Sequence, residues 1–204
     1  MGNAEPVRSE PENQAGAGLH PQKVFASNTR VCVEEPLREG EIALNLGSGK
    51  CLWPGWVNVD QAGADVHADL LALPFPDNHA DRIASIHVLE HFYFWDAPRF
   101  LDECKRTLKP GGTITLELPC MDSVFGYIAD CVNKNKAPSA TFSWLALWGD
   151  PAYRNPGMCH RWGYFKSDMR KLLSAAGFEN IQEASARYHF PQRDMRFTAQ
   201  KGAS

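Results

Sequence analysis

The chain has 204 residues, 44% of them hydrophobic and 22% charged, which suits one globular domain with a sizeable core. Its formal net charge of -3 argues against nucleic-acid binding, which usually requires a clustered basic face. No segment reaches the roughly 18 consecutive apolar residues that cross a bilayer, and the N-terminus lacks a signal-peptide pattern. We therefore expect a cytoplasmic protein with no membrane or nucleic-acid partner. The oligomeric state is not readable from the sequence.

Residues 1–40 are expected to form an N-terminal extension, partly disordered, because residues 1–22 are rich in Glu, Pro and Gly and lack apolar periodicity. A short strand is expected near residues 29–33. Residues 41–204 are expected to form the single domain. The six cysteines contain no C-x-x-C pair, so free thiols are expected and no metal site is predicted.

From residue 41 onward, short apolar runs alternate with helical patterns, which predicts a largely parallel sheet covered on both faces. Five strands are predicted at residues 42–46, 57–60, 65–67, 82–87 and 113–118, and two closing strands at 178–183 and 195–200. Helices are predicted at residues 95–108 and 167–176, each followed by glycines suited to end it.

The first connection of this sheet is short. Only about ten residues separate Gly47 from the second strand, whereas a parallel crossover normally needs a dozen or more, usually with a helix. The first helix is therefore expected to be reduced to a turn. That leaves the adjacent site more open, or covered by the N-terminal segment or another chain.

Ligands of open α/β sheets bind at the carboxyl ends of the strands. The first strand ends in Gly47-Ser48-Gly49, where glycines allow a sharp turn and a close approach of ligand to backbone. Asp60 ends the second strand, where its carboxylate either accepts hydrogen bonds from ribose hydroxyls or forms a turn.

Further polar residues follow the next two strands. Asp69 either accepts a hydrogen bond from an adenine amino group or caps a short turn. His87 and His91 stand at the carboxyl end of the strand at 82–87, where a cofactor and its co-substrate meet. Each of these histidines has a purely structural alternative.

Five motifs in this order carry a family resemblance: residues 44–49, 57–60, 69–77, 87–91 and 108–112. With them, the chain resembles the class I S-adenosylmethionine-dependent methyltransferases, specifically the type 11 methyltransferase domain. The resemblance covers about residues 41–119 well and continues loosely to Gly177-Phe178. It implies an α/β, Rossmann-like, doubly wound and mostly parallel sheet with a closing antiparallel strand, and S-adenosylmethionine as cofactor.

The resemblance also implies roles for individual residues. The methionine part of the cofactor is expected at Gly47, Ser48 and Gly49, the ribose at Asp60, the adenine at Asp69 and Leu70, and His87 is expected beside the bound cofactor. One position departs from the family: Asn45 stands where an acidic residue usually contacts the amino group of the cofactor.

Residues 120–166 form a long, aromatic-rich insertion after the fifth strand, expected on the acceptor side. Its aromatic residues either stack on flat or sugar-like rings or build a small second core. His160, near its end, is a candidate general base for a hydroxyl acceptor because its ordinary pKa lies near neutrality. His91 is the second candidate. Residues 160–163 resemble a subgroup of these methyltransferases found with glycan-biosynthesis enzymes.

The sequence thus predicts O-methylation of a small-molecule or glycan-like acceptor. A nicotinamide-dependent oxidoreductase is disfavoured because position 52 is Leu52 where its fingerprint needs a third glycine. A non-catalytic, methyltransferase-like binding subunit is the alternative, kept open by Asn45 and the short first crossover.

Overall fold

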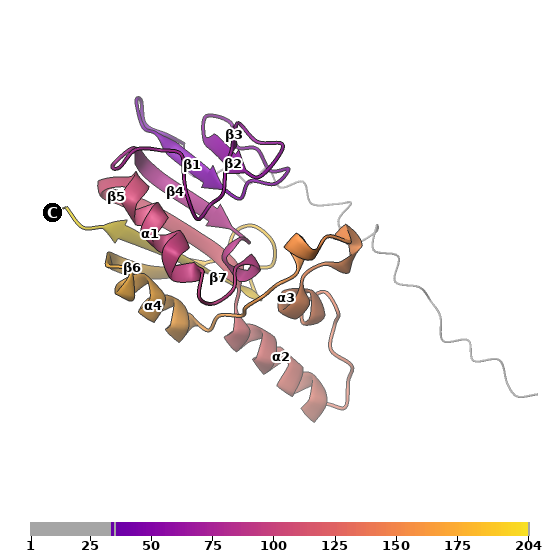
Figure 1. The fold of residues 1–204 in the computed structure, drawn as a ribbon. Helices are drawn as coiled ribbons and strands as arrows, with labels where there is room; N and C mark the ends of the chain where they lie inside the picture. The colour runs from indigo at the N-terminus through magenta and orange to yellow at the C-terminus, as the bar shows by residue number, and fades with distance from the viewer. Residues whose placement is uncertain (1–33, 35, 204) are drawn as a thin grey trace, which may run out of the picture. The chain divides into compact units, whose positions relative to one another are not determined.

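A computed structural model of the protein describes Glu34 and residues 36–203 (Figure 1). The strand expected near residues 29–33, and most of the expected N-terminal extension, lie outside this range. No helix among the described residues is long and apolar enough to span a membrane.

A single seven-stranded sheet organises these residues. In chain order its strands are β1 (Ala43–Leu46), β2 (Val57–Asp60), β3 (Val66–His67), β4 (Ala80–Ile86), β5 (Leu108–Pro119), β6 (Phe178–Ser185) and β7 (Asp194–Lys201). They lie side by side in the order β3-β2-β1-β4-β5-β7-β6. All pairs up to β5 are parallel, and β7 is antiparallel to both neighbours. The predicted Rossmann-like, mostly parallel sheet is confirmed.

The element boundaries agree with the predicted ranges to within a few residues, except at the start of β5. Helix α1 ends at Thr107, and β5 begins at Leu108 without an intervening loop. The glycines predicted to turn the chain lie inside the strand, where Gly111 has φ 78° and the pairing with β4 shifts register between Ala80 and Arg82. The glycines therefore form a β-bulge within the strand and not the predicted turn before it.

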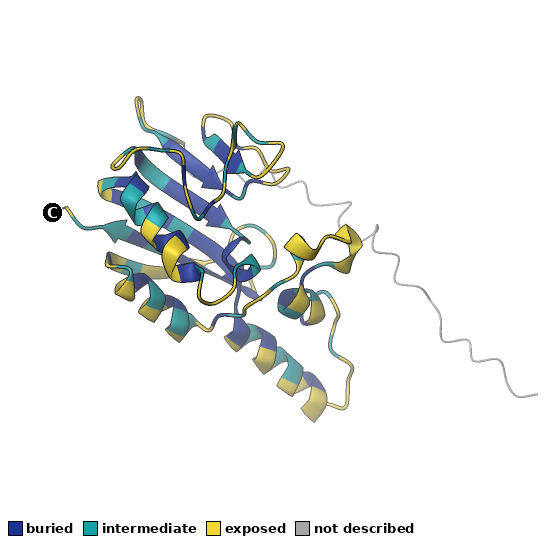
Figure 2. Ribbon diagram, viewed as in Figure 1, coloured by how far each residue is buried: buried dark blue, intermediate teal, exposed yellow. Residues whose placement is uncertain are grey.

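Two helices pack on the same face of the sheet. α1 (Ala97–Thr107) and α4 (Lys166–Ala175) lie in front of the strands in Figure 1, and Figure 2 shows their outer sides exposed. Phe100, Leu101 and Met169 share one core with Leu44 and Phe197. Their helical spacing places these side chains on the faces that meet the sheet.

The expectation of helices on both faces holds for one face only, as far as the structure describes the chain. On the other face, Trp53 and Trp56 form a separate small core with Ala43 and Ala84. The Trp53 and Trp56 rings meet edge-on at 4.9 Å, and Trp53 stacks on Tyr188 at 5.5 Å. The two indoles thus cover this face of the sheet, where the shortened first crossover provides no helix.

The insertion after β5 folds into helices that the sequence did not predict. α2 (Met121–Asn133) and α3 (Trp144–Trp148) are followed by the 3-10 turns η3 (Pro151–Tyr153) and η4 (Pro156–Met158). Met121, Val124 and Ala146 form a small core of their own. The second-core alternative is therefore correct, but its buried members are not the aromatic residues.

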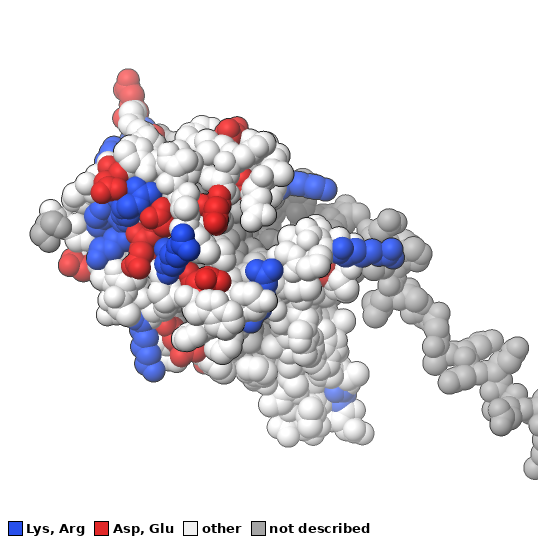
Figure 3. All heavy atoms as spheres, viewed as in Figure 1, with Lys and Arg blue, Asp and Glu red and all other residues white. Residues whose placement is uncertain are grey.

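The aromatic residues of this insertion are largely exposed. Trp144, Trp148 and Tyr153 are 41%, 61% and 59% exposed. Figure 3 shows few charged side chains over this part of the surface, whereas both signs of charge crowd around α1. On the face seen in Figure 3, the insertion thus presents a mostly uncharged surface with a few basic side chains.

Candidate functional site

The turn after β1 is fixed by its backbone. The amide groups of Gly47 and Ser48 both donate to the carbonyl of Val59, at 2.8 and 3.2 Å. Gly47 has φ 71°, and a Cβ atom there would lie 2.3 Å from Cγ2 of Val88. Because a side chain would collide, only glycine lets this turn pack against the segment that follows β4.

Asp60 holds the other side of the turn. Its Oδ2 accepts a hydrogen bond from the Gly49 amide at 2.8 Å, and its Oδ1 accepts one from the Gln61 amide at 2.6 Å. Each carboxylate oxygen has a second lone pair, so Asp60 can shape the turn and still accept hydrogen bonds from a ligand. Both roles suggested for it are compatible with this geometry.

Two observations test whether this edge fits the family's cofactor. The hydroxyl of Ser48 is buried and has no hydrogen-bond partner among the described residues, and space is open where a side chain of Gly49 would stand. An orphaned polar group beside an open backbone turn suits a polar ligand that approaches closely. Together with the Asp60 carboxylate, these residues fit S-adenosylmethionine.

Asn45 serves the fold. Its side-chain amide donates to the carbonyl of Cys51 and to Oδ1 of Asn58, both at 3.0 Å. Asn58 in turn accepts from the Trp53 amide at 2.8 Å and donates to Asp65 at 2.7 Å. Since a carboxylate cannot donate hydrogen bonds, an acidic residue at position 45 would not hold the short crossover in this way.

Asp69 and Leu70 lie after β3. Oδ1 of Asp69 accepts from the Leu71 amide at 2.9 Å, which is the turn-capping arrangement, and Leu70 is buried in the main core. Their contact with an adenine stays a prediction.

His87 lies at the end of β4 in a left-handed backbone conformation, φ 54°, that is unfavourable for a non-glycine residue. Its amide donates to the Glu117 carbonyl at 2.7 Å. Its ring stands between two buried carboxylates, with Nδ1 at 2.9 Å from Glu90 and Nε2 at 3.2 Å from Asp194. Although burial opposes the charge, these carboxylates raise the pKa of His87 to about 10. The ring is therefore an imidazolium at neutral pH.

The structure brings His91 and His160 together, although they are distant in the sequence. Their rings meet edge-on with centroids 4.9 Å apart. Nδ1 of His91 lies 3.2 Å from the Cys159 carbonyl, and Nδ1 of His160 lies 2.8 Å from the Ala146 carbonyl. Burial lowers the pKa of His160, so its imidazole is neutral near pH 7.

Aromatic side chains adjoin this histidine pair. Arg161 donates to the carbonyl of His91 at 2.9 Å and lies over the ring of Tyr93 at 4.9 Å. Phe94 and Trp162, both about half exposed, meet at 5.0 Å. The rim beside the histidines is therefore aromatic with one exposed basic group, Arg161, and it adjoins the exposed aromatic residues of the insertion.

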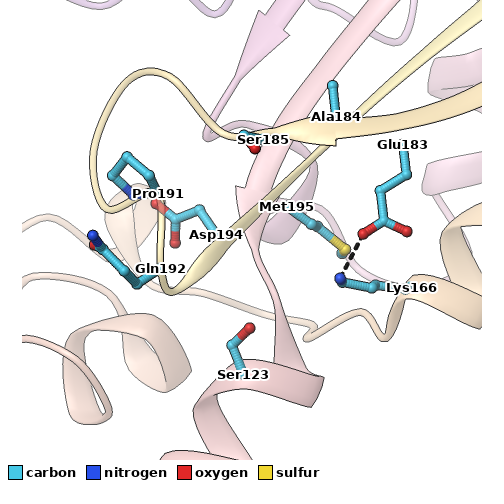
Figure 4. A pocket seen from close by; sticks show the side chains of 9 residues that line it. All are labelled: Ser123, Lys166, Glu183, Ala184, Ser185, Pro191, Gln192, Asp194 and Met195. Carbon is cyan, nitrogen blue, oxygen red and sulfur yellow. Dashed lines mark ion pairs between the residues drawn. The ribbon is translucent and has the colours of Figure 1, made fainter.

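A separate cavity of about 490 Å³ opens near the start of α2 and α4. Figure 4 shows its lining, with the Lys166–Glu183 ion pair on one side and Asp194 on another; the lining residues are Ser123, Lys166, Glu183, Ala184, Ser185, Pro191, Gln192, Asp194 and Met195. Asp194 connects this cavity to His87. None of the residues proposed to bind the cofactor lines it.

Sequence analysis missed three buried acidic groups of this site. Glu90 lies within the motif at residues 87–91, so it could have been identified from the sequence. Asp194 pairs with Arg193 and His87. Glu117 accepts hydrogen bonds from the amides of Arg187 and Tyr188, which ties the β6–β7 connection to β5. No sequence signal indicated that Glu117 meets Arg187 and Tyr188 or that Asp194 meets His87, because these partners lie about 70 residues or more away.

Comparison with known proteins agrees with this architecture. Residues 52–116 match the family described as methyltransferase domain. Over 53 residues the chain is 40% identical to a protein of Mycolicibacterium smegmatis named as a probable S-adenosylmethionine-dependent methyltransferase, covering 26% of this chain and 20% of that protein. The aligned part is thus about a fifth of that relative's length.

Solved structures share the fold at low sequence identity. A methyltransferase from Methanosarcina mazei superimposes with a TM-score of 0.58 at 15% identity, covering 82% of this chain and 95% of that one. One from Archaeoglobus fulgidus gives 0.54 at 15% identity, covering 79% and 86%. Residues 52–116 thus match a methyltransferase domain family, the chain is similar over this part to proteins named as S-adenosylmethionine-dependent methyltransferases, and its fold is that of solved structures with the same description.

Proposed function

We propose that the protein transfers a methyl group from S-adenosylmethionine to a hydroxyl oxygen of a small-molecule or glycan-like acceptor. The observation that carries this proposal is the meeting of two groups of residues at one edge of the sheet. The Gly47–Gly49 turn with Asp60 packs, through Val88, against the segment that holds His91, and His160 reaches the same place from the insertion.

The cofactor would be held by the Gly47–Gly49 turn, Ser48 and Asp60, with Asp69, Leu70 and His87 as further predicted contacts. Bound there, it supplies an activated methyl group on a sulfonium centre, which an acceptor oxygen displaces in line. The protein's own task is to align the acceptor and to remove its proton.

The histidine pair is suited to the proton transfer. A carbonyl oxygen can only accept a hydrogen bond, so Nδ1 of His160, which faces one, carries the proton of the neutral ring. Its Nε2 is then left with a lone pair, and the lowered pKa keeps it available at neutral pH. The hydroxyl proton would pass to this Nε2, or to that of His91, which has the same arrangement.

The rim supports the proposed acceptor class. Exposed aromatic rings such as Phe94, Trp148 and Trp162 bind flat or sugar-like rings by stacking. The neighbouring surface in Figure 3 carries few charged groups, and Arg161 at the rim already donates to the His91 carbonyl and lies over Tyr93, so we expect an acceptor without strong charge. A neutral ring that carries a hydroxyl group fits best.

Calorimetric titration with S-adenosylmethionine and S-adenosylhomocysteine tests the cofactor half. We expect Asp60→Ala to weaken both affinities by roughly ten- to a hundredfold, the effect of losing hydrogen bonds to a charged group. Asp102→Ala, which removes an exposed carboxylate on α1, is the matched control and should leave them unchanged. A folded protein that binds neither compound would contradict the proposal.

A screen of hydroxylated ring compounds for product formation tests the acceptor half. Turnover that falls at least about a hundredfold in His160→Ala, with cofactor affinity retained, would support a general base. Cofactor binding without transfer to any acceptor would favour the non-catalytic binding subunit.

A further inference from the structure

Glu90, His91 and His160 form a cluster with the composition of a metal site. One potential ligand atom from each of the three side chains lies within 4.8 Å of the others. Glu90 and His91 belong to the 3-10 turn η2 (Leu89–His91), which follows β4. His160 comes from the far end of the insertion, and Nε2 of this residue lies 4.0 Å from Oε1 of Glu90.

Both histidines are oriented as metal ligands are. Each directs Nδ1 at a backbone carbonyl, His91 at Cys159 and His160 at Ala146. This second contact fixes the tautomer and leaves Nε2 unprotonated, which is the arrangement that accompanies most histidine ligands in proteins.

Glu90 supplies the third potential ligand. Its side chain is 2% exposed, and Oε1 pairs with Nδ1 of His87. Oε2 is buried and has no hydrogen-bond partner among the residues that the structure describes. A buried carboxylate oxygen without a partner is costly, and a cation would remove that cost.

The cluster is also held together by the backbone. The amides of Arg161 and Trp162 both donate to the carbonyl of Glu90, at 2.7 and 3.3 Å. These bonds tie the segment that carries His160 to the turn that carries Glu90 and His91. The three side chains are therefore brought together by the fold and do not depend on an ion to meet.

We propose that Glu90, His91 and His160 bind a divalent first-row transition-metal ion, of the class of Zn²⁺, Mn²⁺ or Fe²⁺. Two imidazoles and one carboxylate are a ligand set that such ions accept. Ligand atoms that share one ion at about 2.1 Å lie roughly 3–3.5 Å apart, whereas these atoms lie up to 4.8 Å apart. Binding therefore requires the cluster to contract by roughly 1–2 Å through side-chain rotation. The cysteine pattern of the sequence predicted no metal site, and these three residues depart from that expectation.

A three-ligand site leaves coordination positions open. Within the proposed function, on which this step rests, such an ion would act as a Lewis acid that lowers the pKa of the acceptor hydroxyl. His91 and His160 would then be ligands in place of general bases. Metal binding itself does not depend on methyl transfer and can be measured without an acceptor.

The test uses the full chain, freed of metal by a chelator and titrated calorimetrically with ZnCl₂ and with MnCl₂. Binding of one ion per chain is expected, and Co²⁺ should give the visible absorption of a site containing nitrogen ligands. His91→Gln and His160→Gln should each weaken binding at least about tenfold. His67→Gln, which removes an exposed histidine on β3, should not change it.

Failure to bind any of these ions, or equal binding by the wild-type protein and both histidine variants, would overturn the proposal. Because His91 is only partly buried, its variant should fold even if His160→Gln does not, and it keeps the test decisive. Titration of the same metal-free protein with S-adenosylmethionine reports on the cofactor site separately. Loss of the metal site and loss of the proposed function are thereby distinguished.

Discussion

The proposed cofactor side and the proposed acceptor side of the candidate site are built differently. On the cofactor side, backbone groups carry the geometry: Gly47 and Ser48 donate to Val59, and Gly49 donates to Asp60. On the acceptor side, side chains carry it, with His160 held by one carbonyl and with aromatic rings exposed around it. A backbone-built turn depends on the few residues that allow its conformation. A side-chain surface can change its residues while its scaffold stays, which suits a region that selects an acceptor.

Removal of Glu117 should have the largest effect on stability. Its carboxylate accepts from the amides of Arg187 and Tyr188 and from Arg196 at 3.2 Å, all close to the sheet. Glu117→Ala would leave the buried Arg196 paired with Glu34 alone and would remove the acceptor of the Arg187 and Tyr188 amides. We expect a loss of roughly 2–4 kcal/mol in the free energy of unfolding. Chemical denaturation measures it, and the exposed Glu179→Ala serves as control. A loss below 1 kcal/mol would mean that the β6–β7 connection is held by other contacts.

Gly47→Ala should come next, because it combines a collision with an unfavourable φ. We expect a loss of about 2–3 kcal/mol in unfolding free energy, together with weaker cofactor binding. Gly111→Ala separates the two causes, since Gly111 has φ 78° but open space around it. If both variants lose equal stability, the contact with Val88 contributes nothing, and the turn is limited by its backbone conformation alone.

Asn45→Asp tests whether the residue at position 45 serves the fold or the cofactor. It restores the acidic residue usual at this position but removes the donor to Cys51 and Asn58. We expect about 1–3 kcal/mol of destabilisation and no gain in affinity for S-adenosylmethionine, measured by denaturation and calorimetry on the same sample. The exposed Asn133→Asp controls for added charge. Tighter cofactor binding by the variant would show that Asn45 weakens the site.

Trp162→Ala should have the smallest effect on stability. The side chain is 46% exposed and contacts Phe94, so we expect less than about 1 kcal/mol in unfolding free energy. Affinity for S-adenosylmethionine should be unchanged, while the KM for the acceptor rises. A variant that loses cofactor affinity instead would remove the distinction between the two sides.

The sequence predicts the strands around the proposed cofactor side better than the insertion on the proposed acceptor side. Strands β1 to β5 were readable because short apolar runs closed by glycines and acidic residues repeat in a fixed order. Helix α2 is also marked in the sequence, since Met121, Val124, Ile128 and Cys131 recur at helical spacing. The aromatic residues of the same insertion suggest a ligand-binding surface, which obscures this pattern. Helix α3, with five residues, is too short for any periodicity to mark it.

The site was predictable in its residues but not in its pairings. His87, His91 and His160 were each singled out, yet nothing in the sequence indicated that His87 lies between Glu90 and Asp194. Such contacts depend on where β7 returns beside β5 and on how the insertion folds back, and both are set by long-range packing. The roles of the cofactor-side residues stay predictions until binding is measured.

The helix-free first crossover gives the protein a built-in optical probe. Trp53 and Trp56 are each 5% exposed, and Trp53 stacks on Tyr188, whereas Trp95, Trp144, Trp148 and Trp162 face solvent. Emission from the first pair should therefore be shifted to the blue and poorly quenched by iodide, and coupling between the two indoles should add a circular-dichroism signal. Since these indoles lie in the loop that joins Gly49 to β2, occupancy of the turn can be followed by light, without a label.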